Sequence, residues 1–350
     1  MLVFGLGSGE VSLVDETNGE TLWCEKRYDE VGTRGMSVAC SPDGNCIASV
    51  DRSSRRWTLW DIDGTIHPYP KHGLMGWLEY VTFSPCNKLI AVISCDGRMK
   101  VYDTRTNLVF WDYFSDDLLY SASFSADSLF LAAVSKYGSV HIRYASTGNA
   151  FKKMDMEGLG EFCPINNNLF ATTNGDYLAL WNIETKAKLW TVKHGRDDFR
   201  GIQNFARFSP DGKTIATVQQ DRRQESTDPV SDSGKDSDTE EDYEDQINNV
   251  LVVHSANGQT KFSLKHQKFD SVYEAAFSHG GNQLACVGSC PENHGFCVIW
   301  NMSDGNVIYR LYSSCDIRSL AWVSDMHRHE ALAMALHERI QLNLNHLRIV

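Results

Sequence analysis

The sequence lacks any long hydrophobic run. Its longest apolar stretches, such as residues 129–134, are far shorter than the roughly 20 residues that a membrane-spanning helix needs. The amino terminus, Met1-Leu2-Val3-Phe4-Gly5, has neither a basic segment nor a small-residue cleavage site. A secretory signal is therefore not expected, and we expect no membrane partner.

Cysteine is present but without a regular spacing. The ten cysteines are scattered singly, mostly within apolar strand-like patterns, as at Cys40, Cys163 and Cys286. A disulfide framework would show cysteines in an even, patterned array. The pattern favours reduced, buried thiols and therefore a location in the cytoplasm or the nucleus.

A basic stripe is missing as well. The formal net charge is −12, and residues 221–245 alone carry −8, with eleven carboxylates against Arg222, Arg223 and Lys235. The rest of the chain is nearly balanced. Because no basic patch is available to neutralise phosphates, nucleic acid is not an expected partner.

What the sequence does have is an internal repeat. Residues 208–218 read as an aromatic strand end, a Ser-Pro-Asp-Gly turn and a second apolar strand, and each turn residue has a conformational reason to be there. The signal recurs as Cys40-Ser41-Pro42-Asp43, Phe83-Ser84-Pro85-Cys86, Phe124-Ser125-Ala126-Asp127, Phe162-Cys163-Pro164-Ile165, Phe208-Ser209-Pro210-Asp211, Phe277-Ser278-His279-Gly280 and Trp322-Val323-Ser324-Asp325. Successive spacings are 43, 41, 38, 46, 69 and 45 residues. All but the 69 lie near the period of roughly 40–45 residues that is typical of a four-stranded propeller blade.

Two further columns keep the same register. An apolar residue followed by alanine recurs at Ile47-Ala48, Ile90-Ala91, Leu131-Ala132, Phe170-Ala171, Ile215-Ala216, Leu284-Ala285 and Leu332-Ala333. A small residue suits a strand where two sheets press face to face. The third column ends a strand at Leu59-Trp60-Asp61, Val101-Tyr102-Asp103, Leu180-Trp181-Asn182 and Ile299-Trp300-Asn301, and turn residues follow each copy.

Together these columns resemble the WD40 repeat family, and the resemblance covers essentially the entire chain. It implies an all-β fold, a single WD40-type β-propeller over residues 1–350. The Gly-His dipeptide of the family is nearly absent, since His72-Gly73 and His194-Gly195 are reversed. The resemblance implies a non-catalytic scaffold or adaptor that recruits proteins or peptides at one rim, within a multiprotein complex.

The number of blades is left at seven or eight. Four further third-strand signals are weaker or incomplete: Tyr144-Ala145, His254-Ser255, Leu342-Asn343 and the strand expected at residues 11–15. The eight signals predict eight repeat units, the first without its innermost strand, whereas seven is the commoner number in the family. Either the carboxyl-terminal segment supplies a strand that closes the ring, or an upstream segment is missing. Residues 347–350 are expected to form a short outer strand of the last unit.

An acidic insertion at 221–247 interrupts the blade formed by about 203–264. Low hydrophobicity and like charges predict a disordered loop. Ser233, Ser237 and Thr239 each have a carboxylate three residues on, a pattern that acidophilic kinases prefer, and each phosphate would add about −1.5 to −2 of charge. Residues 232–237 also resemble the Asp-Ser-Gly-x-x-Ser phosphodegron, and the alternative is a solvated spacer.

No motif predicts an enzyme or a cofactor. Cys286, Cys290, His294 and Cys297 offer four metal-type ligands within twelve residues, but we interpret them as buried thiols beside a surface histidine and expect no metal. The glycines of 5–9 precede a strand rather than a helix, so they are read as a turn and not as a phosphate loop.

Two columns vary where their neighbours are uniformly apolar, five and seven positions before the aligned serine. Variable positions that enter the innermost strands at one rim are expected to contact partners. The residues with the aromatic or arginine chemistry of binding hot spots are Arg34, Trp77, Tyr120, Tyr273 and Arg318.

An alternative function rests on Tyr102-Asp103-Thr104-Arg105. This segment looks like the Trp-Asp-x-Arg motif by which some WD40 proteins dock on the adaptor of a cullin–RING ubiquitin ligase. The resemblance implies that Arg105 carries the contact and Asp103 braces the turn, which would make the chain a substrate receptor. The other interpretation is an ordinary repeat ending.

Overall fold

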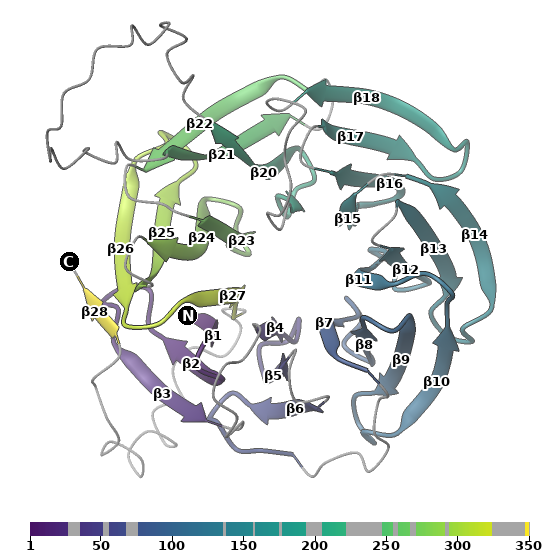
Figure 1. Ribbon diagram of the computed structural model, residues 1–350, viewed down its shortest axis with the longest axis horizontal. Coiled ribbons are helices and arrows are strands. Elements are labelled where there is room, and N and C mark those ends of the chain that lie inside the picture. Colours follow the sequence, from purple (N-terminus) through teal and green to yellow (C-terminus); the bar gives the residue numbers. More distant parts are fainter. Residues whose placement is uncertain are drawn as a thin grey trace, which may run out of the picture.

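The computed structural model shows an all-β protein whose sheets are arranged in a ring around a common centre (Figure 1). It describes residues 1–26, 36–51, 56–67, 76–135, 138–156, 158–174, 177–193, 205–221, 247–254, 258–266, 271–290, 294–323 and 347–349. The architecture is a β-propeller. Within these residues no helix is long and apolar enough to cross a membrane.

The strands form seven sheets in the described part of the chain. The sheet β27-β1-β2-β3 contains Ile317–Trp322, Leu2–Leu6, Glu10–Val14 and Thr21–Lys26, and the three-stranded sheet β4-β5-β6 contains Met36–Cys40, Cys46–Asp51 and Arg56–Asp61. The sheet β7 to β10 contains Leu78–Phe83, Leu89–Ser94, Arg98–Asp103 and Val109–Phe114, and β11 to β14 contain Leu119–Phe124, Phe130–Ser135, Ser139–Tyr144 and Ala150–Asp155. The sheet β15 to β18 contains Leu159–Cys163, Asn166–Thr173, Tyr177–Asn182 and Ala187–Lys193, and β19 to β22 contain Ala206–Phe208, Thr214–Asp221, Ile247–His254 and Thr260–His266. The five-stranded sheet β23-β24-β25-β26-β28 contains Ser271–Phe277, Gln283–Cys290, His294–Asn301, Val307–Ser313 and Leu347–Ile349.

The repeated turn works through its serine and its aspartate. The N–H of Thr214 donates to Ser209 Oγ over 3.0 Å, and Ser209 Oγ donates in turn to Asp211 Oδ1 over 2.7 Å. The same serine bond recurs in the turns that begin at Ser41, Ser84, Ser125 and Ser278. Gly212 has a φ of 65°, which glycine adopts without the clash that a side chain would meet. The positive φ expected at the turn glycine is confirmed, whereas the serine bond was not predicted from the sequence.

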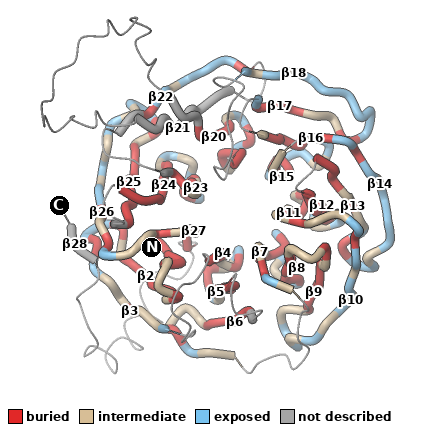
Figure 2. Tube along the Cα trace, viewed as in Figure 1, coloured by how far each residue is buried: buried red, intermediate tan, exposed pale blue. Residues whose placement is uncertain are grey.

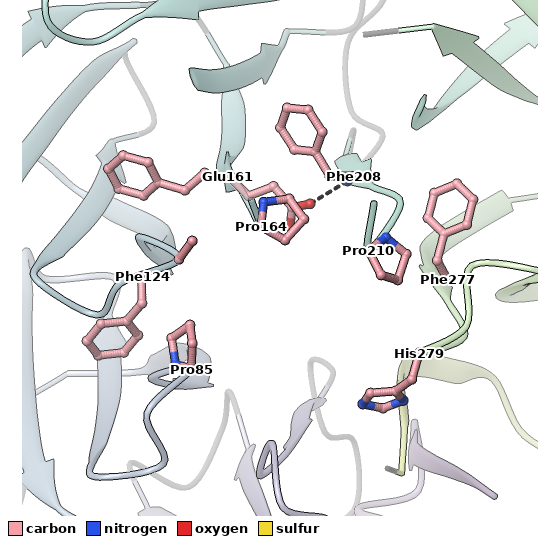
Figure 3. Close-up of a pocket in the computed structure, with 10 residues that line it drawn as sticks. Pro85, Phe124, Glu161, Pro164, Phe208, Pro210, Phe277 and His279 are labelled. Carbon is pink, nitrogen blue, oxygen red and sulfur yellow. Dashed lines mark hydrogen bonds between the residues drawn. The ribbon is translucent and has the colours of Figure 1, made fainter. Parts of the chain in front are cut away.

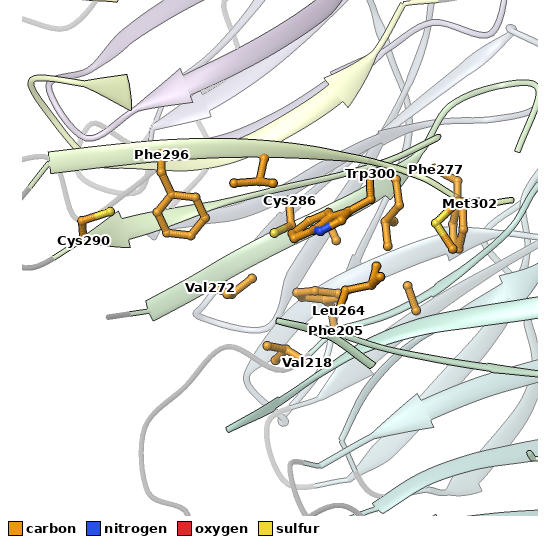
Figure 4. Packing of buried hydrophobic residues seen from close by; sticks show 14 residues of the cluster. Phe205, Val218, Leu264, Val272, Phe277, Cys286, Cys290, Phe296, Trp300 and Met302 are labelled. Atoms are coloured by element: carbon orange, nitrogen blue, oxygen red, sulfur yellow. The ribbon is translucent and has the colours of Figure 1, made fainter. Parts of the chain in front are cut away.

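The alanine column lies in the seams between neighbouring sheets. Ala48, Ala91, Ala132, Ala171 and Ala216 are completely buried. Figure 4 shows one such seam, where Val218 and Leu264 of one sheet meet Cys286 and Trp300 of the next. Small residues let two sheets approach closely, and the larger side chains then fill the space between them. The buried residues gather on the inner and middle strands, whereas outermost strands such as β14 and β18 are largely exposed (Figure 2).

The ring is closed by a strand from the far end of the chain. β27 pairs with β1 over Leu2↔Trp322 to Leu6↔Ile317, so it supplies the innermost strand that the first repeat unit was predicted to lack. The last unit therefore begins inside the first sheet rather than beginning a sheet of its own. Its later strands, expected near residues 332 and 342, lie outside the described residues.

The segment 347–350 is placed differently from the prediction. It contains β28, which pairs with β26 as the fifth strand of the preceding sheet, with Leu311↔Ile349 and Ser313↔Leu347 as the outer pairs of the ladder. The predicted outer strand of the last unit is thus replaced by an addition to a free strand edge, where unpaired N–H and C=O groups are available.

The acidic insertion connects two paired strands. The ladder between β20 and β21 runs from Thr214↔His254 to Asp221↔Ile247. Residues 222–246 link its last pair and lie outside the described residues. They include the predicted phosphorylation candidates Ser233, Ser237 and Thr239.

Candidate functional site

The variable column predicted at the rim coincides with a series of β-bulges. The pairing register of the innermost strand shifts around Glu79, Tyr120, Tyr273 and Arg318, so each is the extra residue of its strand. A bulge redirects a side chain that regular pairing would hold on the sheet face. The four strands therefore present these side chains at equivalent places around the ring.

A cavity of about 100 Å³ lies among the inner strands at this level. Its lining residues are Met36, Ser37, Tyr80, Tyr120, Ser121, Leu159, Phe205, Arg207, Tyr273, Glu274, Arg318 and Ser319. Three of the five predicted partner-binding residues, Tyr120, Tyr273 and Arg318, are thus brought together. We refer to this set of residues as the inner cavity.

Arg318 and Tyr273 contact each other at the inner cavity. The guanidinium carbon of Arg318 lies 4.3 Å from the centroid of the Tyr273 ring, within the range of a cation–π interaction. Arg318 also pairs with Asp316, and the Tyr273 hydroxyl lies 3.0 Å from Ser289 Oγ. Within the described residues, Arg318 Nε and the Oγ of Ser121 are buried atoms without a hydrogen-bond partner. Arg318 and Ser121 both line the inner cavity, so these atoms could form hydrogen bonds with a bound group.

Below the bulges, Arg207 organises a buried ionic network that the sequence did not indicate. Its Nη2 lies 2.8 Å from Glu274 Oε1 and 3.4 Å from the Tyr80 hydroxyl, and its Nη1 lies 3.5 Å from Glu161 Oε2. Burial alone lowers the pKa of Arg207, but the surrounding acidic groups reverse this and raise its pKa above the ordinary value. Burial also raises the pKa of Tyr80 to about 12, so this hydroxyl is neutral at pH 7. The network therefore holds one permanent cation between two carboxyl groups.

Polar side chains also join neighbouring inner strands. In each case a side-chain oxygen of one strand accepts a backbone N–H of the next. The pairs are Ser123 with Phe162, Glu161 with Phe208, Glu274 with Leu320 and Ser319 with Val38. Because these N–H groups are on strand edges, the side chains satisfy donors that would otherwise be unpaired. At these four junctions the inner strands are tied to one another as well as within each sheet.

The other ends of the inner strands surround a second, larger cavity of about 370 Å³. This opening is surrounded by Pro85, Pro164, Pro210 and His279, all from the repeated turns (Figure 3). Two arginines and Glu274 line the inner cavity, whereas proline and phenylalanine side chains make up most of the lining of this opening, together with Glu161 and His279. The two ends of the propeller thus offer different chemistry.

The remaining predicted partner-binding residues are placed apart from the inner cavity. Trp77 precedes β7, is 42% exposed and is not among the lining residues of either cavity. Arg34 lies outside the described residues.

The candidate adaptor-docking segment has one buried and two accessible members. Tyr102 is completely buried and packs against Trp57, with ring centroids 4.8 Å apart. Asp103 Oδ1 accepts 2.8 Å hydrogen bonds from the N–H and the hydroxyl of Thr106, and these bonds hold the pKa of Asp103 below its usual value. Arg105 is exposed on the same turn. The geometry gives Tyr102 a place in the core and leaves Arg105 exposed.

The cysteines around residue 290 do not converge on one point. Cys286 and Cys290 belong to one buried cluster, whereas Cys297 belongs to the cluster on the other side of the sheet. Alternate residues of a strand point to opposite faces, and β24 and β25 pair Val287 rather than Cys286 with Cys297. The interpretation of these residues as buried thiols fits this placement.

Sequence reasoning missed Glu161, Arg207 and Glu274. All three are charged residues within otherwise apolar inner strands. A charged residue in such a strand was the signal that could have indicated a buried ion pair. Which of them would pair could not be inferred, because Arg207 and Glu274 are 67 positions apart.

A search against known protein families finds no family model that matches the chain, and no curated protein matches its sequence. The class that the structure defines is therefore the β-propeller, and the site must be interpreted from its own residues.

Proposed function

We propose that this chain is a WD40-type β-propeller that acts as a non-catalytic interaction platform and recruits proteins or peptides at the rim around the inner cavity. The WD40 assignment is supported by the serine-bonded turns and by buried aromatic residues near the third-strand ends, such as Trp60 and Trp300. We count the three-stranded sheet β4-β5-β6 as a blade, which gives a seven-bladed ring closed by β27.

The observation that carries the proposal is the meeting of Tyr120, Tyr273 and Arg318 at one cavity. Bulges on three separate inner strands place them there, although they are far apart in the sequence. Aromatic and arginine side chains are enriched among the residues that dominate binding energy at protein interfaces. The wall behind them is held by the Arg207 network, so a partner would meet a preorganised surface.

The partner class follows from charge. Of the charged residues that line the inner cavity, Arg207 pairs with Glu274 and with Glu161 behind the wall, and Arg318 pairs with Asp316, so positive charge does not dominate. Mixed charge with aromatic rings suits a protein or peptide better than a nucleic acid backbone. We propose a place in a multiprotein complex of the cytoplasm or the nucleus.

The experiment is affinity purification from cells followed by mass spectrometry, with the wild type and the double variant Tyr120→Ala/Tyr273→Ala compared side by side. The matched control is Phe110→Ala, which removes a 52% exposed aromatic ring from β10 on the outer edge of the ring. We expect the main partner to be lost with the double variant and kept with the control. Equal recovery from all three proteins would refute the rim assignment.

A second candidate function is a substrate receptor of a cullin–RING ubiquitin ligase. The observation that favours it is the turn at Asp103, which is braced by Thr106 and leaves Arg105 exposed. In this alternative the purified complex would contain a ligase adaptor and a cullin, and Arg105→Ala would remove both. A stable complex without ligase components would favour the interaction platform.

A further inference from the structure

Cys46, Asp61 and His67 form a side-chain cluster at one end of the sheet β4-β5-β6, away from the inner cavity. Cys46 begins β5 and Asp61 ends β6, and the two residues are directly opposite each other in the ladder. Opposed residues of an antiparallel pair have neighbouring side chains on the same face. The first two members are therefore brought together by strand register alone.

The third member is brought in by a turn. After Asp61 the chain reverses at Gly64, whose φ is 84°, and the N–H of Asp61 donates to the carbonyl of Thr65 over 2.8 Å. The N–H of His67 then donates to the carbonyl of Leu59 over 2.9 Å. These backbone bonds hold His67 beside the end of β6, so its ring meets the carboxylate of Asp61.

The three ligand-type atoms lie within 4.8 Å of one another. Asp61 Oδ1 is 2.7 Å from His67 Nε2 and 4.0 Å from Cys46 Sγ. We propose that Cys46, Asp61 and His67 bind a zinc-class divalent cation through Sγ, a carboxylate oxygen and an imidazole nitrogen. Thiolate, imidazole and carboxylate are the three protein ligand types that zinc uses.

Coordination requires side-chain shifts, including closure of the Cys46–His67 distance, which is at most 4.8 Å. Zinc bond lengths of about 2.0–2.3 Å in a tetrahedron place neighbouring ligand atoms about 3.3–3.6 Å apart. The His67–Asp61 distance must therefore open, and the Cys46–Asp61 distance must close, each by less than about 1 Å. Three protein ligands leave the fourth position for a water molecule or a partner's side chain. Binding replaces the thiol proton of Cys46, which is released to the solvent, so affinity rises with pH.

The cluster is both supported and accessible. Ser41 Oγ accepts the N–H of Cys46 over 2.8 Å, which fixes the backbone of that ligand. The side chains of His67 and Asp61 are 36% and 45% exposed, so a cation can enter from solvent. A bound cation would cross-link β5, β6 and the returning segment. This cross-link would stabilise a sheet that has three strands in the described residues, whereas the other sheets have four or five.

The test uses the full chain, freed of metal with a chelator and titrated with Co²⁺ as a spectroscopic probe and then with Zn²⁺. We expect one metal per chain, a thiolate-to-cobalt charge-transfer band, and a higher melting temperature with zinc. Cys46→Ser should abolish the band, and His67→Gln should weaken binding at least about tenfold. Cys86→Ser is the matched control, since Cys86 is an exposed thiol outside the cluster, and it should bind like the wild type.

Two results would overturn the proposal. The first is a wild-type protein that shows neither the band nor a zinc-dependent melting shift. The second is binding that survives both Cys46→Ser and His67→Gln unchanged, because the metal would then lie elsewhere. The His67 variant keeps the test decisive if the Cys46 variant folds poorly, since His67 is a partly exposed residue outside the strands.

Discussion

The guanidinium of Arg318 lies over the ring of Tyr273, 4.3 Å from the ring centroid. The two residues come from β27 and β23, inner strands of neighbouring sheets that contact each other. Each is the extra residue of a bulge. The contact therefore joins the strand that closes the ring to the strand beside it, at the cavity where we place the partner. Closure of the fold and assembly of the site therefore depend on the same strand, β27.

Replacing Arg207 with methionine is expected to destabilise the protein strongly. The change leaves Glu161 and Glu274 close together without their shared cation, at side-chain exposures of 22% and 14%. Removing one partner of a buried ion pair costs about 3–5 kcal/mol, and we expect about 3 kcal/mol of unfolding free energy to be lost in urea denaturation. Lys213→Met is the control, because its pair with Asp211 is 77% exposed on the lysine side and should change stability by less than about 0.5 kcal/mol. Equal effects of the two variants would contradict the structural role of the network.

A side chain at Gly97 is expected to disrupt the sheet β7 to β10, because Gly97 lies in the turn between β8 and β9. Gly97 has a φ of 89°, and an added Cβ would stand 2.2 Å from the carbonyl oxygen of Ser115. A backbone oxygen cannot move aside as a flexible side chain can, so Gly97→Ala should cost more than about 2 kcal/mol in thermal or urea unfolding. Gly280→Ala provides the comparison, since its nearest neighbour is the end of the Asn282 side chain at 3.3 Å. A Gly97 variant as stable as the Gly280 variant would show that this turn is not formed as described.

His141 is expected to make stability depend on pH in the weakly acidic range. Desolvation lowers the pKa of His141 below 6.5, although the carboxylate of Asp117, 3.0 Å away, opposes the shift. The unfolded chain therefore binds more protons than the folded one below about pH 7, and unfolding free energy falls as pH falls through that window. The slope contributed by one such group is at most about 1.4 kcal/mol per pH unit.

The measurement is urea unfolding of the wild type and His141→Gln at several values between pH 7 and pH 5. We expect the loss of stability with falling pH to be shallower in the variant, because glutamine does not titrate. Parallel curves would contradict a histidine that is kept neutral by folding.

The fold could be predicted because its signals are local. Ser209 recurs in the repeat because its hydroxyl holds the N–H five residues later, and Ala216 recurs because the seam between sheets leaves room for a methyl group. Both requirements act within one unit and repeat with it. The closure of the ring was left open, since the pairing of β1 with β27 joins residues more than 300 positions apart.

The site could be predicted only in part. Variation in one column pointed to Tyr120, Tyr273 and Arg318, because bulges are placed at the same register in successive units. Tyr102 fits the repeat pattern as well as a docking motif, and its burial against Trp57 is compatible with both interpretations. The pairing of Arg207 with Glu161 and Glu274 depends on the curvature of the ring. This curvature cannot be inferred from the sequence of any single repeat.

The most direct test of the interaction platform is the dissociation constant of the main captured partner, measured with purified wild type, Tyr273→Ala and Phe110→Ala. Tyr273→Ala removes the ring beneath Arg318, and a hot-spot residue costs at least about 2 kcal/mol when truncated, or roughly thirtyfold in affinity. Circular dichroism and melting temperature verify that each variant is folded. We predict a loss of at least about thirtyfold for folded Tyr273→Ala with less than about threefold for Phe110→Ala. Unchanged affinity of the folded Tyr273 variant would contradict the placement of the partner at the inner cavity.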